Sequence, residues 1–263
     1  MAKPKRHGTC HLCGCNGLLS FEHVPPEAAF NDQKVLLADI NKVLAGDMLE
    51  HLHNPRGRTQ QRGAGAYTLC EPCNNYTGGW YGRAYVEFAK QLMPYCWMPR
   101  DRFGIIPCTI KPLNVYKQIL VMFCSASPPA VTQKRPELVR YLLNPQSRDG
   151  GGHERVFLGL YDLANSKSTR QSGMSGRISG DRIHVFSEIS YPPFNLIWSA
   201  SGGNPDPGLV DITWFNQFEY GQSADVTLAL RTLPVNSVFP ADYRTVDEIR
   251  QQASANTGAA LLP

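Results

Sequence analysis

The chain has 263 residues, of which 42% are hydrophobic, and a formal net charge of +4. This length suits one large domain or two ordinary ones, and the composition excludes an intrinsically disordered chain. No stretch approaches the roughly 18–20 uninterrupted apolar residues of a membrane span, and no apolar segment follows the basic start as in a secretory signal. We therefore expect a cytoplasmic protein with no membrane partner. The small positive charge is compatible with a polyanionic partner without indicating one.

The cysteines fall into two classes. Four of the eight form two CxxC pairs, Cys10 with Cys13 and Cys70 with Cys73, and the rest are scattered. In a reducing compartment, paired CxxC turns favour a metal over disulfides. Four thiolates are the tetrahedral ligand set that structural zinc prefers, and an all-cysteine site is usually closed. The sequence therefore predicts a structural zinc ion, with four unrelated buried thiols as the alternative.

The first third of the chain alternates short predicted elements with turns. The run LLSFEHVPPEAAF reads as a strand that ends at Pro25 and Pro26, which cannot continue a ladder. Apolar residues at helical spacing predict a helix within 31–50. A basic, glycine-rich stretch follows and is predicted to be a loop; it carries Arg56, Arg58 and Arg62. After the second CxxC pair, apolar positions three and four apart predict a helix over about 75–92.

Beyond a predicted boundary near 95–105 the pattern changes. Residues 112–124 read as a buried helix and 136–143 as a short helix. From about residue 154, runs such as RVFLGLYD, RIHVFSEIS, FNLIWSA, DITWFNQFEY and DVTLALRTL indicate strands separated by turn residues. The predicted organisation is a module at 1–95, a mixed α/β domain dominated by antiparallel sheet at 105–250, and a loose tail at 251–263.

Three further residues lie where chemistry is expected. Glu22 and His23 stand at the end of the predicted strand, within FEHVPP, and Asn74 follows the last cysteine of the second pair, within LCEPCNNYTGGWYG. This pattern resembles the HNH (ββα-metal, treble-clef) endonuclease superfamily, in particular the endonuclease VII-like resolvases of phages. It is also similar to bacterial HNH endonuclease-like proteins that carry EHVPP and CNNxTG segments. The resemblance covers about the first third of the chain.

The resemblance implies an α+β protein that begins with a zinc-bound treble-clef module. It makes His23 the general base that deprotonates the attacking water, and Glu22 and Asn74 the residues that hold a catalytic Mg²⁺ or Mn²⁺. The residue types suit these roles: a neutral imidazole accepts a proton near pH 7, and carboxylate and amide oxygens are ligands for hard cations. The implied activity is a metal-dependent endonuclease that acts on DNA, with RNA as the other substrate, in defence or in a mobile element.

The chain departs from the family pattern at two points, and other interpretations stay open. Where the family often has an asparagine before the second CxxC pair, this chain has Gly63–Tyr67, and its acidic residue is glutamate rather than aspartate. Glu22 and His23 can instead hydrogen-bond the turn, and Asn74 can instead cap the helix. The arginines Arg56, Arg58 and Arg62 suit phosphate contacts, but a solvated loop fits them equally well.

Two other functions compete with the nuclease. The first is a non-catalytic zinc module that binds nucleic acid or a protein, and the second is an enzyme whose site lies in the C-terminal half. A homo-oligomer is compatible with the sequence.

Overall fold

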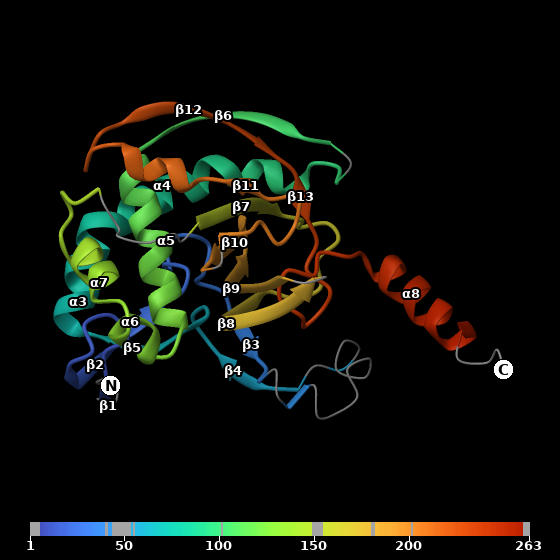
Figure 1. The fold of residues 1–263 in the computed structure, drawn as a ribbon, viewed down its shortest axis with the longest axis horizontal. Helices are drawn as coiled ribbons and strands as arrows, with labels where there is room; N and C mark the ends of the chain where they lie inside the picture. The colour runs from blue at the N-terminus through green and yellow to red at the C-terminus, as the bar shows by residue number, and fades with distance from the viewer. Residues whose placement is uncertain are drawn as a thin grey trace.

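The protein is described here by a computed structural model, which covers residues 6–39, 42–43, 54, 56–100, 102–148, 155–179, 182–200 and 202–259. It combines helices with mostly antiparallel sheets (Figure 1), as the sequence predicts. Within these residues, no helix is both long and apolar enough to cross a membrane.

The N-terminal part is built on a three-stranded antiparallel sheet followed by a long helical segment. Its strands run in the order β1 (Arg6–Thr9), β2 (Asn16–His23) and β5 (Gly65–Cys70). Strand β2 ends at His23, directly before Val24 and Pro25, as the prolines predict. The helical segment consists of α3 (Glu71–Thr77), a π-helical turn (Gly78–Gly82) and α4 (Arg83–Leu92). It begins four residues earlier than predicted, because Pro72 occupies its first turn.

Within the predicted helix at 31–50, the described residues are helical only at 42–43. Val35–Leu37 form strand β3, which pairs with β4 (Arg58–Gln60) in a separate two-stranded sheet. The predicted basic loop is therefore partly a strand. A three-residue apolar run carries too little periodicity to distinguish helix from strand, and the pairing partner, which lies about twenty residues away, decides. Residues 31–34 and 38–39 belong to no helix or strand, and 40–41 and 44–50 lie outside the described residues.

The middle of the chain forms helices around a buried helix, α5. The predicted helices at 112–124 and 136–143 are confirmed as α5 (Pro112–Ala126) and α7 (Pro136–Leu143), with the short α6 (Ala130–Gln133) between them. Strand β6 (Gly104–Ile110) was not predicted and pairs with β12 (Ala224–Leu230). Side chains of β6 alternate between buried and exposed positions: Ile106, Cys108 and Ile110 are buried, whereas Ile105 is exposed.

The C-terminal part is a six-stranded sheet. Its main path runs β11 (Val210–Asp211), β7 (Arg155–Tyr161), β10 (Phe194–Ser199), β9 (Arg182–Tyr191) and β8 (Arg170–Ser179), and β13 (Thr232–Leu233) pairs with β7 in parallel. The predicted strand over DITWFNQFEY is mostly wrong, because only Val210–Asp211 pair and Thr213–Gln217 form a 3₁₀ turn. That turn buries Phe215 completely, so its aromatic residues fill the core rather than line a strand.

The stretch predicted as a tail is helical up to residue 259. Residues 246–259 form helix α8 (Val246–Ala259), which extends away from the body of the molecule (Figure 1), and 260–263 lie outside the described residues. A capping box explains where α8 begins. The Glu248 amide donates to the Thr245 hydroxyl over 3.2 Å, and the Glu248 carboxylate accepts from the Thr245 amide over 2.6 Å.

The larger of two hydrophobic clusters contains residues from both the range 1–95 and the range 105–250. Phe88 on α4 stacks on Phe194 of β10 with their ring centroids 4.8 Å apart, and Phe123 on α5 lies 5.9 Å from Trp198. All four side chains belong to the same buried cluster as Leu12 and Leu69 of the N-terminal sheet region. The two ranges are therefore packed against each other through shared apolar contacts.

A buried ion pair organises the far edge of the large sheet. Glu188 on β9 is fully buried and receives two hydrogen bonds from the Arg170 guanidinium on β8, of 2.7 and 2.9 Å. The Ala241 amide and the Tyr243 hydroxyl also donate to this carboxylate, and Arg170 donates to the Ser237 carbonyl. The segment after β13 is thereby fastened to the sheet through one carboxylate.

We expect Arg170→Met to lower the free energy of unfolding by about 3–5 kcal/mol, because it leaves the Glu188 carboxylate buried without its counter-charge. Arg83→Met is the control: it breaks the exposed pair with Glu87 on α4 and should cost under about 1 kcal/mol. Urea unfolding of both variants measures the difference. Equal losses would contradict the role of the buried pair.

Candidate metal centre and active site

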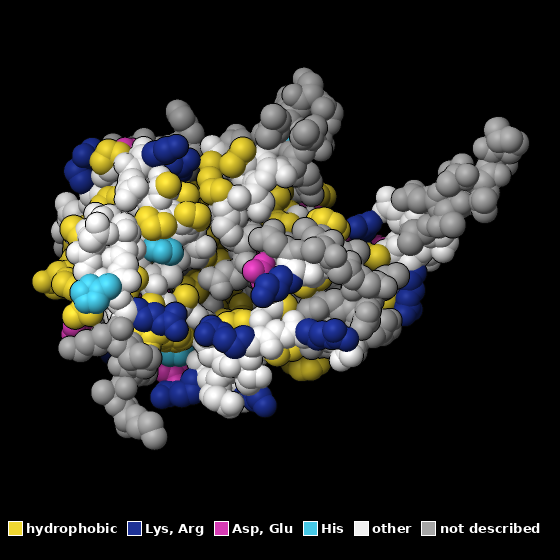
Figure 2. All heavy atoms as spheres, turned by 90° about the horizontal axis from the view of Figure 1, so that it is seen from below, with side chains coloured by type: hydrophobic (Ala, Val, Ile, Leu, Met, Phe, Trp, Pro, Cys, Tyr) yellow, Lys and Arg dark blue, Asp and Glu magenta, His cyan; other side chains and the backbone are white. Residues whose placement is uncertain are grey.

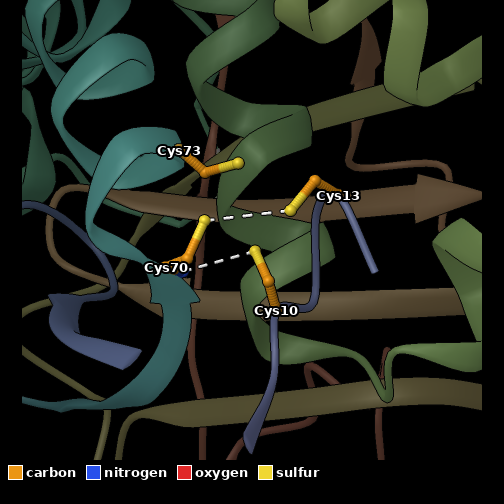
Figure 3. A group of neighbouring side chains, drawn as sticks. All are labelled: Cys10, Cys13, Cys70 and Cys73. Carbon is orange, nitrogen blue, oxygen red and sulfur yellow. Dashed lines mark hydrogen bonds between the residues drawn. The ribbon is translucent and has the colours of Figure 1, made fainter. Parts of the chain in front are cut away.

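Four cysteines converge at one point in the N-terminal part (Figure 3). Cys10 and Cys13 lie in the turn after β1, Cys70 ends β5, and Cys73 lies in the first turn of α3. Their sulfur atoms all lie within 4.8 Å of one another. The Cys13 and Cys70 sulfurs are 3.8 Å apart, which is about the edge of a tetrahedron with metal–sulfur bonds of ~2.3 Å. The four cysteines could therefore hold a metal ion such as zinc.

A backbone hydrogen bond supports one of the four sulfurs. The Cys70 amide donates to the Cys10 sulfur over 3.3 Å, the kind of outer contact that orients a metal-binding thiolate. The hydrogen bond from the Cys73 thiol lowers the pKa of Cys10 to about 4, and the same interaction together with burial raises the pKa of Cys73. Without a cation, ionisation of one thiol thus opposes that of the next. A bound cation would remove this opposition.

The first CxxC turn is anchored to the helices of the second half. The His11 ring shares a hydrogen bond of 3.0 Å with the Ser125 carbonyl on α5, and Thr132 on α6 donates to the His11 carbonyl over 2.6 Å. Thr68, on the neighbouring strand β5, contacts the Ser125 hydroxyl over 2.6 Å. These contacts place the cysteine cluster rigidly against α5 and α6.

We expect the purified protein to carry one zinc ion per chain, and Cys13→Ser to lose it and to unfold at a lower temperature. Cys15→Ser is the matched control, because Cys15 is exposed and lies outside the four-cysteine cluster. Elemental analysis by mass spectrometry and thermal unfolding measure both effects. Full zinc in Cys13→Ser, or equal zinc loss in Cys15→Ser, would argue against this site.

Glu22 is the most unusual charged residue of the N-terminal part. It is only 9% exposed, and no hydrogen bond or ion pair joins its carboxylate to a described residue. Burial raises the pKa of Glu22 to about 7. A carboxylate in this environment is stabilised by a cation that reaches it, since no basic side chain of the described residues pairs with it.

His23 is half-buried and held in one orientation. Its Nε2 lies 3.0 Å from the Arg62 carbonyl oxygen, and its ring packs edge-on against Phe21 with centroids 4.9 Å apart. A carbonyl can only accept a hydrogen bond, so Nε2 carries the proton in the neutral ring and Nδ1 keeps its lone pair. No described residue hydrogen-bonds to Nδ1. The imidazole therefore presents an unprotonated nitrogen fixed by its other side.

Asn74 joins helix α3 to strand β2. Its side-chain amide donates to the Ser20 hydroxyl over 3.0 Å and to the Phe21 carbonyl over 3.3 Å. The ring contact between Phe21 and His23 places these two side chains on one face of β2, and the pairing with β5 shifts register between Ser20 and Phe21. Asn74 is thus fastened to the two strand residues that directly precede Glu22. The helix cap is at Cys70, so Asn74 is not the cap.

A residue that the sequence did not single out supports this end of β2. Asn31 is fully buried, donates to the Pro25 and Ala64 carbonyls over 2.6 and 2.8 Å, and accepts from the Ala64 amide over 2.6 Å. Gly63 has a positive φ, and a Cβ there would lie 1.8 Å from the Asn31 carbonyl oxygen. Packing against Asn31 thus demands a glycine in the Gly63–Tyr67 stretch. An isolated asparagine in a turn gives no pattern that predicts this role.

The three arginines, Arg56, Arg58 and Arg62, differ in their partners and exposure. Arg62 is paired with Glu27, and Arg58 donates to Gln60 within β4. Arg56 is exposed, next to residue 55, which is not described. Their contact with nucleic acid stays a prediction.

Comparisons with protein-family models, with curated proteins and with solved structures find no match. The assignment of this site therefore depends on its own residues and their geometry.

We expect Glu22→Gln to make the protein more stable than the wild type at pH 8, in buffer without added divalent cations. An acid whose pKa is raised on folding stabilises the fold below its unfolded pKa and loses that contribution as the pH rises through its folded pKa. A pKa of about 7 against the ordinary 4.5 corresponds to a wild-type loss of about 3 kcal/mol between pH 4 and 8.

Urea unfolding at several pH values tests this expectation. Glu71→Gln is the control, because Glu71 is exposed at the start of α3 and its replacement should change stability by no more than ~1 kcal/mol. The expectation fails if the difference in the free energy of unfolding between Glu22→Gln and the wild type does not increase from pH 4 to pH 8.

Proposed function

We propose that the N-terminal module hydrolyses phosphodiester bonds in DNA, with His23 as the general base. One observation carries the proposal: the Arg62 carbonyl holds Nε2, which leaves Nδ1 of a half-exposed imidazole free to take a proton from water. An imidazole with one unprotonated nitrogen is well suited to take a proton from water. RNA is the second substrate to test, because the reacting phosphodiester is the same.

The residues present fit a hard divalent cation such as Mg²⁺ or Mn²⁺. The Glu22 carboxylate has no described partner, and the Asn74 side chain uses its NH₂ group on Ser20 and Phe21, which leaves its oxygen for a cation. When bound, such a cation would offset negative charge that develops on the phosphate. The burial of Glu22 strengthens this electrostatic interaction, because little water screens it.

The cysteine cluster has a structural part in this proposal. Cys73 precedes Asn74 directly, and Cys70 ends the strand that pairs with β2. A metal ion on the four sulfurs would therefore fix the start of α3 relative to β2, and with it the position of Asn74. The all-cysteine ligand set leaves no open coordination position, which separates this ion from the chemistry.

The test is cleavage of supercoiled plasmid, single-stranded DNA and RNA by zinc-loaded protein. We expect cleavage with added Mg²⁺ or Mn²⁺ and a loss of at least ~100-fold in His23→Ala. His7→Ala is the matched control, since His7 is an exposed histidine on the neighbouring strand β1. The divalent cation should be omitted rather than chelated, because a chelator also competes for zinc.

Each outcome decides between the candidates. Cleavage that needs His23 but not His7 supports the nuclease. Cleavage that survives in His23→Ala places the reaction elsewhere in the chain and overturns the proposal. If neither the wild type nor the variants cleave although zinc is bound, the non-catalytic binding module becomes the better interpretation.

A further inference from the structure

A large cleft lies between the N-terminal module and the C-terminal sheet. Its volume is about 1070 Å³. One side is formed by β3 with Val24 and Ala64, and the other by α6, β8 and the segment 237–240. On the face seen in Figure 2, Lys and Arg side chains gather along the lower edge of a central hollow.

The described lining of the cleft carries positive charge and no carboxylate. Its ionisable side chains, apart from a tyrosine, are Lys134, Arg135, Lys167 and Arg170. The Arg170 charge is matched by the buried Glu188, but no ion pair joins Lys134 or Lys167 to a described acidic residue. Both lysines are exposed. The cleft thus attracts an anionic ligand through two lysines, one at the end of α6 and one in the connection between β7 and β8.

The remainder of the lining is polar without charge, or apolar. Hydroxyl groups are contributed by Ser168, Thr169, Ser172, Ser175 and Ser237. Apolar walls are contributed by Val131, Ile189 and Val238, with Tyr191 on the floor and the partly exposed Phe239 at the margin.

The lining and the size together favour an extended ligand that has phosphates and flat apolar groups. Small-molecule pockets typically span about 300–1,000 Å³, and this cleft lies at or beyond the upper limit. A DNA duplex keeps its base faces stacked inside, so it would satisfy the lysines but leave the apolar walls uncovered. An unpaired strand offers its phosphates to lysines and its base faces to apolar and aromatic side chains.

The cleft adjoins the candidate active site through the chain itself. Val24 follows His23, and the Val24 amide donates to the Ala64 carbonyl over 3.1 Å, so both lining residues flank the His23–Arg62 contact. On the floor, the Tyr191 hydroxyl reaches the Phe30 carbonyl of the module over 3.5 Å. A strand that lies in the cleft would therefore extend towards His23.

We propose that this cleft binds an unpaired DNA strand, with Lys134 and Lys167 on its phosphates and Phe239 against a base, and leads the strand to His23. The proposal rests on the proposed nuclease function only in making the bound strand its substrate. Binding itself needs no catalysis, so the two can fail separately.

The test is fluorescence-anisotropy binding of a labelled oligonucleotide of about 12 nucleotides to zinc-loaded His23→Ala protein, without added Mg²⁺ or Mn²⁺. Single-stranded and duplex forms of one sequence are compared over a range of salt concentrations. We expect the single strand to bind more tightly. Adding Lys134→Ala and Lys167→Ala should weaken its binding and reduce the salt slope, d log K/d log [salt], by about 1.4, since each phosphate contact contributes about 0.7 for single strands.

Two controls separate a specific cleft from general basicity. Lys90→Ala with Lys111→Ala removes the same charge from exposed positions outside the cleft and should leave the salt slope unchanged. Phe239→Ala should weaken single-strand binding without changing the slope, because stacking involves no counterion release.

Equal effects of the two lysine pairs, or tighter binding of the duplex, would overturn the proposal. So would binding of a mononucleotide that is as tight as that of the oligonucleotide, which would make the cleft a small-molecule site. Cleavage that depends on His23 while the cleft variants bind and cleave normally refutes the cleft alone. Specific single-strand binding by a wild type that never cleaves refutes the nuclease alone.

Discussion

The N-terminal part depends on four thiols that meet at one point. They come from the turn after β1, the end of β5 and the first turn of α3, so their convergence joins three elements at one point. Thiolates repel one another at this separation. The pKa of Cys10 is therefore lowered while the pKa of Cys73 is raised, because ionising the first opposes ionising the second. A bound cation would offset this repulsion and turn the cluster into a local constraint on the fold. The position of Asn74 follows, because it is covalently next to one of the four sulfurs.

This constraint reaches the rest of the chain through polar contacts as well as through the core. His11, between the first two cysteines, is fastened to Ser125 and Thr132 of the helical layer, and the Phe88–Phe194 stack ties α4 to the large sheet. A module held in this way cannot swing freely relative to the C-terminal sheet. The cleft between them is therefore a property of the rigid fold, and its two lysines keep a defined spacing from the end of β2.

The sequence predicts this architecture best where a signal is local and worst where pairing is distant. The cysteine spacing predicts the cluster, the prolines predict the end of β2, and the apolar run at 112–124 predicts α5. The helix expected over 31–50 is not formed at Val35–Leu37, because these residues pair with Arg58–Gln60 in a sheet. Local periodicity does not predict such a distant pairing. The start of α8 had a readable signal, the Thr245–Glu248 capping box, that a composition-based view of a polar tail overlooks. The role of Asn31 was beyond reach, because it depends on backbone groups more than thirty residues away.

The end of β2 shows how strand alternation can serve opposite chemical needs at adjacent positions. A ligand for a hard cation benefits from a dry environment, where charge is weakly screened, whereas a general base needs access to water. Glu22 is buried, whereas the adjacent His23 is half-exposed and has one ring nitrogen held by a carbonyl. Asn74 reaches the two residues directly before Glu22, Ser20 and Phe21. If Glu22 and Asn74 held a cation and His23 acted as a base, a substrate would meet the dry position and the accessible one at the same strand end, just before Pro25.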